Sequence, residues 1–286
     1  MEVLINDPLR GVNHCKEVFC MMKNSTDCRV IDTSRRSDPW IIMVHGFTHN
    51  SNYFSAQVSD FRNEYRIFLP DLRGHGKSAS ATGPYGIEEY ADDILESLDD
   101  AGIEKAHYWG THTGSAIGLV LALRCPERFD TLILEGTFLP GYPMPRVGEL
   151  ISRARTIAQS KGVEKALEDW FNHADWFAYI REHPQVCRAK EHKAMTFEFT
   201  GIPWLSNLAP REVTPIIECL GEIDQPSLVY NGMYDLADFK RVALHLKSVL
   251  PNVQCEDIAG AGGFPGWENP KLVNSLVRNF LKKQVR

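Results

Sequence analysis

An imidazole side chain, His112, stands at the centre of residues 110–114, which read GTHTG. This segment separates a short apolar run from a helix-prone stretch, so it predicts a sharp turn between a strand and a helix. The glycines at both ends leave room for that turn, where a Cβ atom would meet neighbouring groups. The central residue is expected at positive φ, which His tolerates better than a β-branched residue does. Held at such a turn, an imidazole can act as a base or as a nucleophile.

Short apolar runs on either side of this turn predict the strands that position it. Trp40–Val44 is continuous and apolar and ends at His-Gly, as a strand buried on both faces of a sheet does. Residues 66–69 repeat the pattern and stop at Pro-Asp. Further strands are predicted at 15–22, 28–33, 107–109, 131–135, 227–230 and Val253–Ile258, the first two forming an antiparallel edge.

Helical patterns lie between these strands. From 87 to 101 the apolar residues recur at steps of three and four, and Gly102 closes the stretch. A second helix is predicted over Thr113–Arg124, where small residues would let it lie close to the sheet, and a third with Asn269 as cap and Pro270 in its first turn. Strands alternating with helices predict an α/β fold with a mostly parallel, eight-stranded sheet flanked by helices.

Residues 140–222 break this alternation and are expected to form an inserted helical cap, between a first core part at 1–139 and a second at 223–286. The cap lies between two strands in the sequence, so we expect it over their carboxyl ends, where ligand sites of open α/β sheets lie. It is rich in aromatic residues, some of which should line an apolar pocket: Trp170, Phe171, Trp176, Phe177, Tyr179, Phe197, Phe199 and Trp204.

Several motifs together resemble those of the α/β-hydrolase superfamily, over nearly the whole chain. Residues 110–114 have the frame of its G-x-S-x-G nucleophile elbow, with His112 in place of the serine. HGF at 45–47 looks like its oxyanion loop, and DLRGHGKS at 71–78 is similar to its D-x-R-G-x-G-x-S turn. NGMYD at 231–235 is similar to the turn that carries the triad acid, here Asp235, and GAGGFP at 260–265 resembles G-A-G-H-F-P with Gly263 in place of the catalytic histidine. Small esterases, enol-lactonases and cofactor-free haloperoxidases are the members that the chain resembles most.

The resemblance implies an altered Ser-His-Asp triad in which only Asp235 keeps its usual residue type. Triad members act as a unit, so vestigial serine hydrolysis is not expected. An imidazole is longer than a hydroxymethyl group, and Gly263 leaves space, so we expect His112 to fill that space and to hydrogen-bond to Asp235. Glu135 ends a predicted strand where some family members carry the acid, and is the alternative partner.

An oxyanion hole is implied at the backbone N–H groups of Phe47 and Thr113, the latter at a helix start, where the dipole favours negative charge. A base beside such a hole suits proton abstraction next to a carbonyl, retro-aldol cleavage or water-assisted lactone opening. Direct attack by His112 would instead give an acyl-imidazole. The hydroxyls of Thr111, Thr113 and Ser115 are expected to point into packing rather than to replace the serine.

Two functions are compatible with these residues. The first is an enzyme acting on a small, fairly apolar carbonyl compound, with His112 in the serine's place. The alternative is a catalytically retired family member that binds a small molecule without turnover. The retained Asp235 favours chemistry, because a buried carboxylate is costly without a partner.

The composition excludes several other classes of protein. The 286 residues include 31 basic and 37 acidic side chains, and the net charge of −6 argues against a nucleic-acid partner. No apolar stretch approaches the length of about 20 residues that spans a bilayer, so no membrane association is expected. The first ten residues lack a signal pattern, and the seven cysteines lack zinc-type spacing, which favours a reduced, cytoplasmic protein.

The remaining histidines do not predict a metal site. No H-E-x-x-H or C-x-x-C spacing occurs, and no G-x-G-x-x-G follows a strand, so neither metal nor cofactor is expected. His49 is interpreted as a surface-loop residue, with a place at the mouth of the pocket as the alternative. His75 with Arg73 is interpreted as a support of their turn, and His107 as a core residue. The expected partner is a small molecule, and the oligomeric state is left open, a homo-oligomer included.

Overall fold

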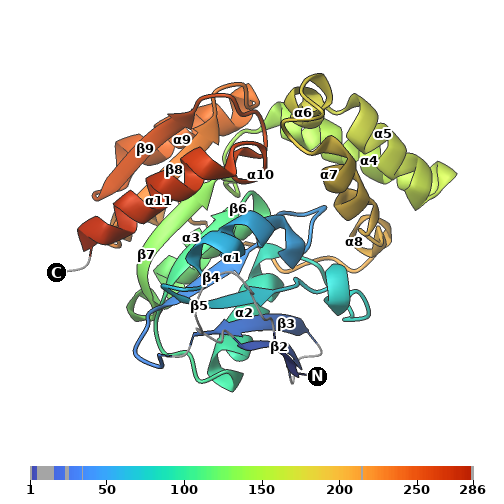
Figure 1. Cartoon of the computed structure of the whole chain (residues 1–286). Helices are drawn as coiled ribbons and strands as arrows, with labels where there is room; N and C mark the ends of the chain where they lie inside the picture. Colours follow the sequence, from blue (N-terminus) through green and yellow to red (C-terminus); the bar gives the residue numbers. More distant parts are fainter. Residues whose placement is uncertain (1, 5–15, 23–25, 34, 214, 285–286) are drawn as a thin grey trace.

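The continuous apolar runs of the sequence form the middle of a single sheet (Figure 1). In the computed structural model, which describes residues 2–4, 16–22, 26–33, 35–213 and 215–284, the strand order is β1-β2-β3-β5-β4-β6-β7-β8-β9. Neighbouring strands from β5 to β9 are parallel, so their carboxyl ends lie along one edge of the sheet. The strands are β1 (Glu2–Leu4), β2 (Lys16–Met21), β3 (Asp27–Asp32), β4 (Trp40–Val44), β5 (Arg66–Pro70), β6 (Ala106–Thr111), β7 (Phe129–Glu135), β8 (Ser227–Gly232) and β9 (Val253–Ile258).

The antiparallel edge predicted from the sequence is confirmed, with one strand more than expected. β2 pairs antiparallel with β3, and β3 with β5. The prediction of eight strands was wrong because the three-residue β1 adds to β2, and a segment this short shows no apolar alternation. Cys15, predicted at the start of the first strand, lies outside the described residues.

The three predicted core helices are present and pack on the sheet. α2 (Ile87–Asp100) packs against α3 (Thr113–Arg124), and α1 (Ser55–Phe61) against α11 (Pro270–Gln284). The small residues of α3 allow its close approach, because a Cβ atom on Gly118 would lie 2.5 Å from the Tyr108 ring. The core also contains α9 (Ala237–Val249), which packs on β8 and β9, and the short α10 (Pro265–Glu268).

Helices α4 to α8, which we call the cap, come between β7 and β8 and lie together on one side of the molecule (Figure 1). The exact domain boundaries at 140 and 222 stay a prediction. The cap consists of α4 (Pro145–Lys161), α5 (Val163–His173), the 3-10 turn η4 (Asp175–Phe177), α6 (Ala178–Glu182), α7 (Ala189–Phe197) and α8 (Ile202–Leu205), and a second 3-10 turn, η5 (Ile217–Glu222), follows it.

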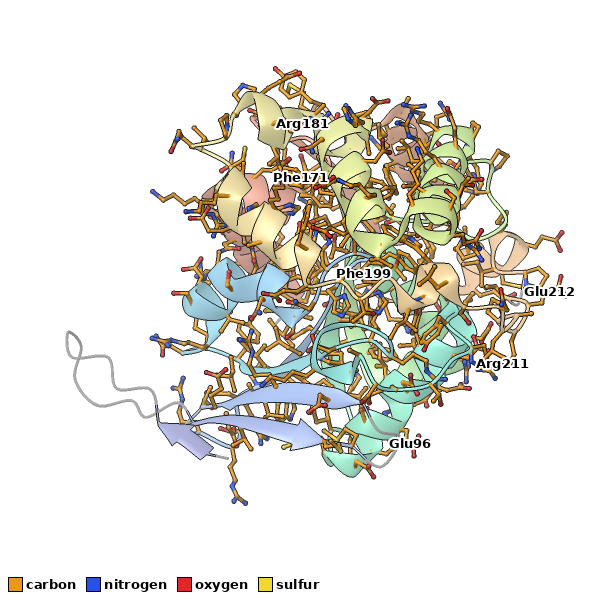
Figure 2. The ribbon with its side chains drawn as sticks, turned by 90° about the vertical axis from the view of Figure 1, so that its right-hand side faces the viewer. Glu96, Phe171, Arg181, Phe199, Arg211 and Glu212 are labelled. Atoms are coloured by element: carbon orange, nitrogen blue, oxygen red, sulfur yellow. The ribbon has the colours of Figure 1, made fainter. Side chains whose placement is uncertain are left out.

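Two contacts hold the end of the cap, and the segment that follows it, against the core. Phe199, which lies between the cap helices and the core in Figure 2, packs its ring 5.5 Å from Phe47 and 5.0 Å from His75. Arg211 pairs with Glu89 and Asp92 of α2. The cap therefore rests on the loop at 45–47 that the sequence singled out.

No helix in the described part of the chain has the length and apolar character needed to cross a membrane.

Candidate active site

The segment at 110–114 forms the expected sharp turn between β6 and α3. His112 has φ 49° and ψ −105°, and is the residue immediately before the helix. Both glycines are required by close approach of the backbone. A Cβ atom on Gly110 would lie 2.4 Å from the carbonyl carbon of Gly114, and one on Gly114 would lie 2.1 Å from the carbonyl oxygen of Val44. The turn therefore holds the His112 side chain in one place.

Each ring nitrogen of His112 has a hydrogen-bond partner. The indole Nε1–H of Trp176 donates to Nε2 at 3.2 Å, and Nδ1 lies 3.0 Å from Oγ1 of Thr111. Because an indole N–H can only donate, Nε2 is an acceptor and the ring proton sits on Nδ1. Thr111 in turn donates from Oγ1 to Oε1 of Glu135 at 2.9 Å. Two neighbours thus fix the tautomer of the ring.

Aromatic rings surround His112 and keep it neutral. Its ring centroid lies 5.0 Å from that of Trp176, 5.1 Å from Phe239 and 5.2 Å from Phe264. Burial among these rings lowers the pKa of His112 to about 3, and a backbone hydrogen bond with Gly263 offsets only part of that effect. At neutral pH the ring is therefore an uncharged acceptor in the resting site.

The space beside Gly263 is filled by Trp176 and not by His112. A Cβ atom on Gly263 would lie 2.4 Å from Cδ1 of Trp176 and 2.7 Å from its carbonyl oxygen. The expectation that His112 itself would move into this space was wrong, because the cap inserts an indole there. No sequence pattern marked this role, since Trp176 was one of many aromatic residues in the cap.

The expected hydrogen bond between His112 and Asp235 is not formed in the described part of the chain. Oδ2 of Asp235 accepts from Nδ2 of Asn231 at 2.8 Å, and Oδ1 accepts from the backbone N–H of Leu236 at 2.7 Å. The two groups are nevertheless near neighbours: Nε2 of His112 and Oδ2 of Asp235 lie 2.8 and 3.7 Å from the point where a Cβ atom on Gly136 would stand. Burial raises the pKa of Asp235 to about 7, although the hydrogen bonds from Asn231 and Leu236 and the charge of Lys240 oppose the shift.

Glu135, the alternative acid, is the carboxylate that connects to His112, through Thr111. Four groups donate to it: Thr111 and the hydroxyl of Tyr53 to Oε1, and the hydroxyl of Tyr230 at 2.7 Å and the backbone N–H of Gly266 at 3.0 Å to Oε2. Burial raises the pKa of Glu135, and these donors partly oppose the shift. A fully buried carboxylate with four donors is a fixed anchor for the residues around it.

The backbone N–H groups of Phe47 and Thr113 have no hydrogen-bond acceptor among the described residues. Thr113 is the first residue of α3, where the helix dipole adds to the attraction for negative charge. Both residues line the same pocket as His112. The other nearby hydroxyl, that of Ser115, is used internally, since it donates to the carbonyls of Gly110 and Glu135.

The pocket in front of His112 has a volume of about 240 Å³ and is largely aromatic. His49 lines it and is buried, which contradicts the surface-loop interpretation and agrees with the alternative of a place at the pocket. The cause is the cap, because His192 of α7 covers His49 at 4.9 Å between ring centroids. The cap also supplies much of the aromatic lining, as expected: Trp170, Trp176 and Trp204, with Phe47, Tyr85, Tyr90, Phe138 and Phe264 from outside it.

His75 and His107 support the fold, as expected. The ring nitrogens of His75 contact the carbonyl oxygens of Arg73 and Phe47, which holds the loop at 45–47 against the turn at 71–78. His107 is buried, with Nδ1 3.0 Å from Oγ1 of Thr131. Among the described residues no cluster of metal-binding side chains occurs.

The chain is similar to known hydrolases in sequence. Residues 39–161 match the family model described as "alpha/beta hydrolase fold". The chain is 25% identical to 3-oxoadipate enol-lactonase 2 of Acinetobacter baylyi over 257 residues, covering 86% of this chain and 89% of that protein. It is 27% identical to a putative carbamate hydrolase of Agrobacterium fabrum over 248 residues, covering 85% of this chain and 93% of that protein.

Solved structures share the fold of this chain. The enol-lactonase from Burkholderia xenovorans superposes with a TM-score of 0.77 at 21% identity, covering 93% of this chain and 100% of that one. The MenH structure from S. aureus gives a TM-score of 0.76 at 19% identity, covering 91% of this chain and 99% of that one. The chain therefore has the α/β-hydrolase fold.

Proposed function

We propose that the chain is an enzyme that hydrolyses a small carbonyl compound in the pocket between the cap and the sheet, with His112 acting in the serine's place. One observation carries the proposal. The backbone N–H groups of Phe47 and Thr113, which have no hydrogen-bond acceptor among the described residues, lie beside an imidazole in an aromatic pocket. Similarity to an enol-lactonase, to carboxylesterases and to a putative carbamate hydrolase supports the same class of substrate.

In this proposal the two N–H groups donate hydrogen bonds to the substrate's carbonyl oxygen and stabilise the negative charge that develops on it. A water molecule attacks the carbonyl carbon, and its proton passes to Nε2 of His112. The tetrahedral intermediate then collapses, and the leaving oxygen or nitrogen takes that proton back. His112 is regenerated, so the cycle needs no cofactor.

The resting site must change before His112 can take a proton. Nε2 already accepts the indole N–H of Trp176, and a pKa near 3 makes the ring a weak base at neutral pH. We propose that the substrate displaces this indole, after which Nε2 faces the attacking water. The charge formed on the ring is stabilised on the Nδ1 side by Thr111 and Glu135, and Asp235 lies near Nε2.

A second candidate function, binding without turnover, is favoured by one observation. Both ring nitrogens of His112 are hydrogen-bonded in the resting site, so nothing in that state is poised to react. The pocket and its two N–H groups would then serve recognition alone.

A paired measurement separates the two candidates. Turnover of an enol-lactone, a carbamate and p-nitrophenyl butyrate is followed at several enzyme concentrations, and the melting temperature is recorded with each compound. Hydrolysis at a rate proportional to enzyme concentration supports the enzyme. Stabilisation of the fold by these compounds without hydrolysis supports the binding protein. A mass increase on His112 during turnover would replace the base mechanism by direct attack of the ring.

A further inference from the structure

We propose that the substrate carries a carboxylate at the end opposite its reacting carbonyl, and that this carboxylate binds Arg155 of the cap. The inference rests on the proposed function, which supplies the carbonyl end of the ligand, and it adds the substrate's charge.

The position of Arg155 follows from the geometry of α4. Val147, Ile151 and Arg155 are four residues apart, so they lie on one face of the helix, and all three line the pocket that contains His112. The same three residues also line an outer hollow, together with polar, uncharged residues such as Ser152 and Thr156. Arg155 therefore lies where the aromatic pocket meets this outer hollow.

Arg155 is the only charged residue among those lining either cavity in the described part of the chain. Within the same part, no carboxylate lies within ion-pair distance of it. The two arginines near it on α4 differ in this respect, since Arg146 pairs with Glu149 and Asp175, and Arg153 pairs with Asp169. One arginine of this helix thus remains free, and it is the one that faces the pocket.

A free guanidinium at the end of an aromatic pocket selects for an anion. Its N–H groups match the two oxygens of a carboxylate. Arg155 itself is exposed, so the pair would form at the solvent-facing end of the pocket. Because His112 is neutral and no acidic residue lines the pocket, nothing in the lining repels or neutralises an anionic ligand. A ligand with its carbonyl at Phe47 and Thr113 would direct its other end along α4 toward Arg155.

The test compares monomethyl glutarate with dimethyl glutarate, which have the same chain length and differ in charge. Binding is measured by isothermal titration calorimetry on the wild type, on Arg155→Met and on the matched control Arg153→Met. We expect the wild type to prefer the monoester by about two- to fivefold, as for an exposed ion pair. Arg155→Met should abolish the preference, and Arg153→Met should keep it. Raising the salt concentration should weaken binding of the monoester only.

The results separate this inference from the proposed function. Equal binding of the two esters by the wild type, or a preference that survives in Arg155→Met, overturns the role of Arg155. Tighter binding of a phosphonate of the same length overturns the assignment of a carboxylate. Release of methanol is followed separately. An Arg155-dependent preference without methanol release supports the charged subsite and contradicts the proposed hydrolysis. Methanol release without the preference supports the hydrolysis and contradicts the charged subsite.

Discussion

The indole of Trp176 occupies the space into which any side chain at Gly263 would extend, with 2.4 Å between Cδ1 and the Cβ position. The same indole donates to Nε2 of His112. A residue of the cap thus lies where the resemblance places the triad histidine. Restoring serine at 112 and histidine at 263 is therefore not sufficient to rebuild a triad, because Trp176 and its backbone block the new ring.

Gly263→Ala should destabilise the protein, because the added methyl group would overlap both the indole and the carbonyl oxygen of Trp176. Overpacking of this kind costs about 1–3 kcal/mol. The matched control is Gly148→Ala in α4, where a Cβ atom would meet nothing within 4 Å and should be neutral or stabilising. Urea unfolding of both variants measures the difference. Equal stability of Gly263→Ala and the wild type would mean that the space beside Trp176 is open.

Thr111→Val should reduce kcat by about 10- to 100-fold, because it breaks the connection between Nδ1 of His112 and Glu135. Thr111→Ser keeps the hydroxyl and should restore most of the activity. Thr131→Val serves as control, since it removes a buried hydroxyl that bonds to His107 away from the pocket. The ¹⁵N shifts of His112 should also report loss of the fixed Nδ1–H tautomer in Thr111→Val alone. Unchanged kcat and unchanged shifts would rule out a role for this connection.

Trp176→Phe should raise the pKa of His112 above its value of about 3, because donation of the indole N–H to Nε2 favours the neutral ring. The pKa should remain below 6.5, since burial still opposes the charge. Trp170→Phe removes an indole that bonds to Thr48 instead and should leave the pKa of His112 unchanged. An NMR titration of the imidazole carbons measures all three proteins. A pKa that does not move in Trp176→Phe would show that the indole bond has no effect on the ring.

Glu268 should make the protein less stable as the pH rises. Burial raises its pKa from 4.5 to about 8, so between these values the unfolded chain loses a proton that the folded chain retains. The stability that the bound proton provides is full below pH 4.5 and is lost as the pH approaches 8, with a slope of at most about 1.4 kcal/mol per pH unit.

Glu268→Gln removes this titration. Relative to the wild type, the variant should be more stable at pH 8 than it is at pH 5, because its amide does not ionise while the carboxyl of Glu268 loses its proton in the unfolded wild type. Asp235, with a pKa of about 7, gives a remaining slope of the same sign between pH 4 and 7. The free energy of unfolding at five pH values measures both effects. Parallel curves for variant and wild type would show that Glu268 titrates normally.

Much of the fold could be predicted from the sequence because it depends on local patterns. The run Trp40–Val44 and the turn around His112 have clear local causes, namely continuous apolar character and paired glycines, and both are found where expected. The strand β1 was missed because three residues carry no periodicity.

The site was predicted less well because its contacts come from distant parts of the chain. Trp176 reaches Gly263 across 87 positions only because the cap folds over the sheet, and no spacing rule connects the two. The role of Thr111 was missed for a related reason, since its neighbour Glu135 belongs to the adjacent strand β7. His49 was assigned to the surface because the helix that covers it lies in the cap.

The most direct measurement of the central claim is kcat/KM of His112→Ala against the wild type on a single hydrolysed ester, with circular dichroism as the check on folding. If His112 carries the proton in the reaction, kcat/KM should fall by about 10²- to 10⁴-fold while the fold is retained. A folded His112→Ala protein with wild-type kcat/KM would contradict the account, because the imidazole at the turn would then have no part in the chemistry.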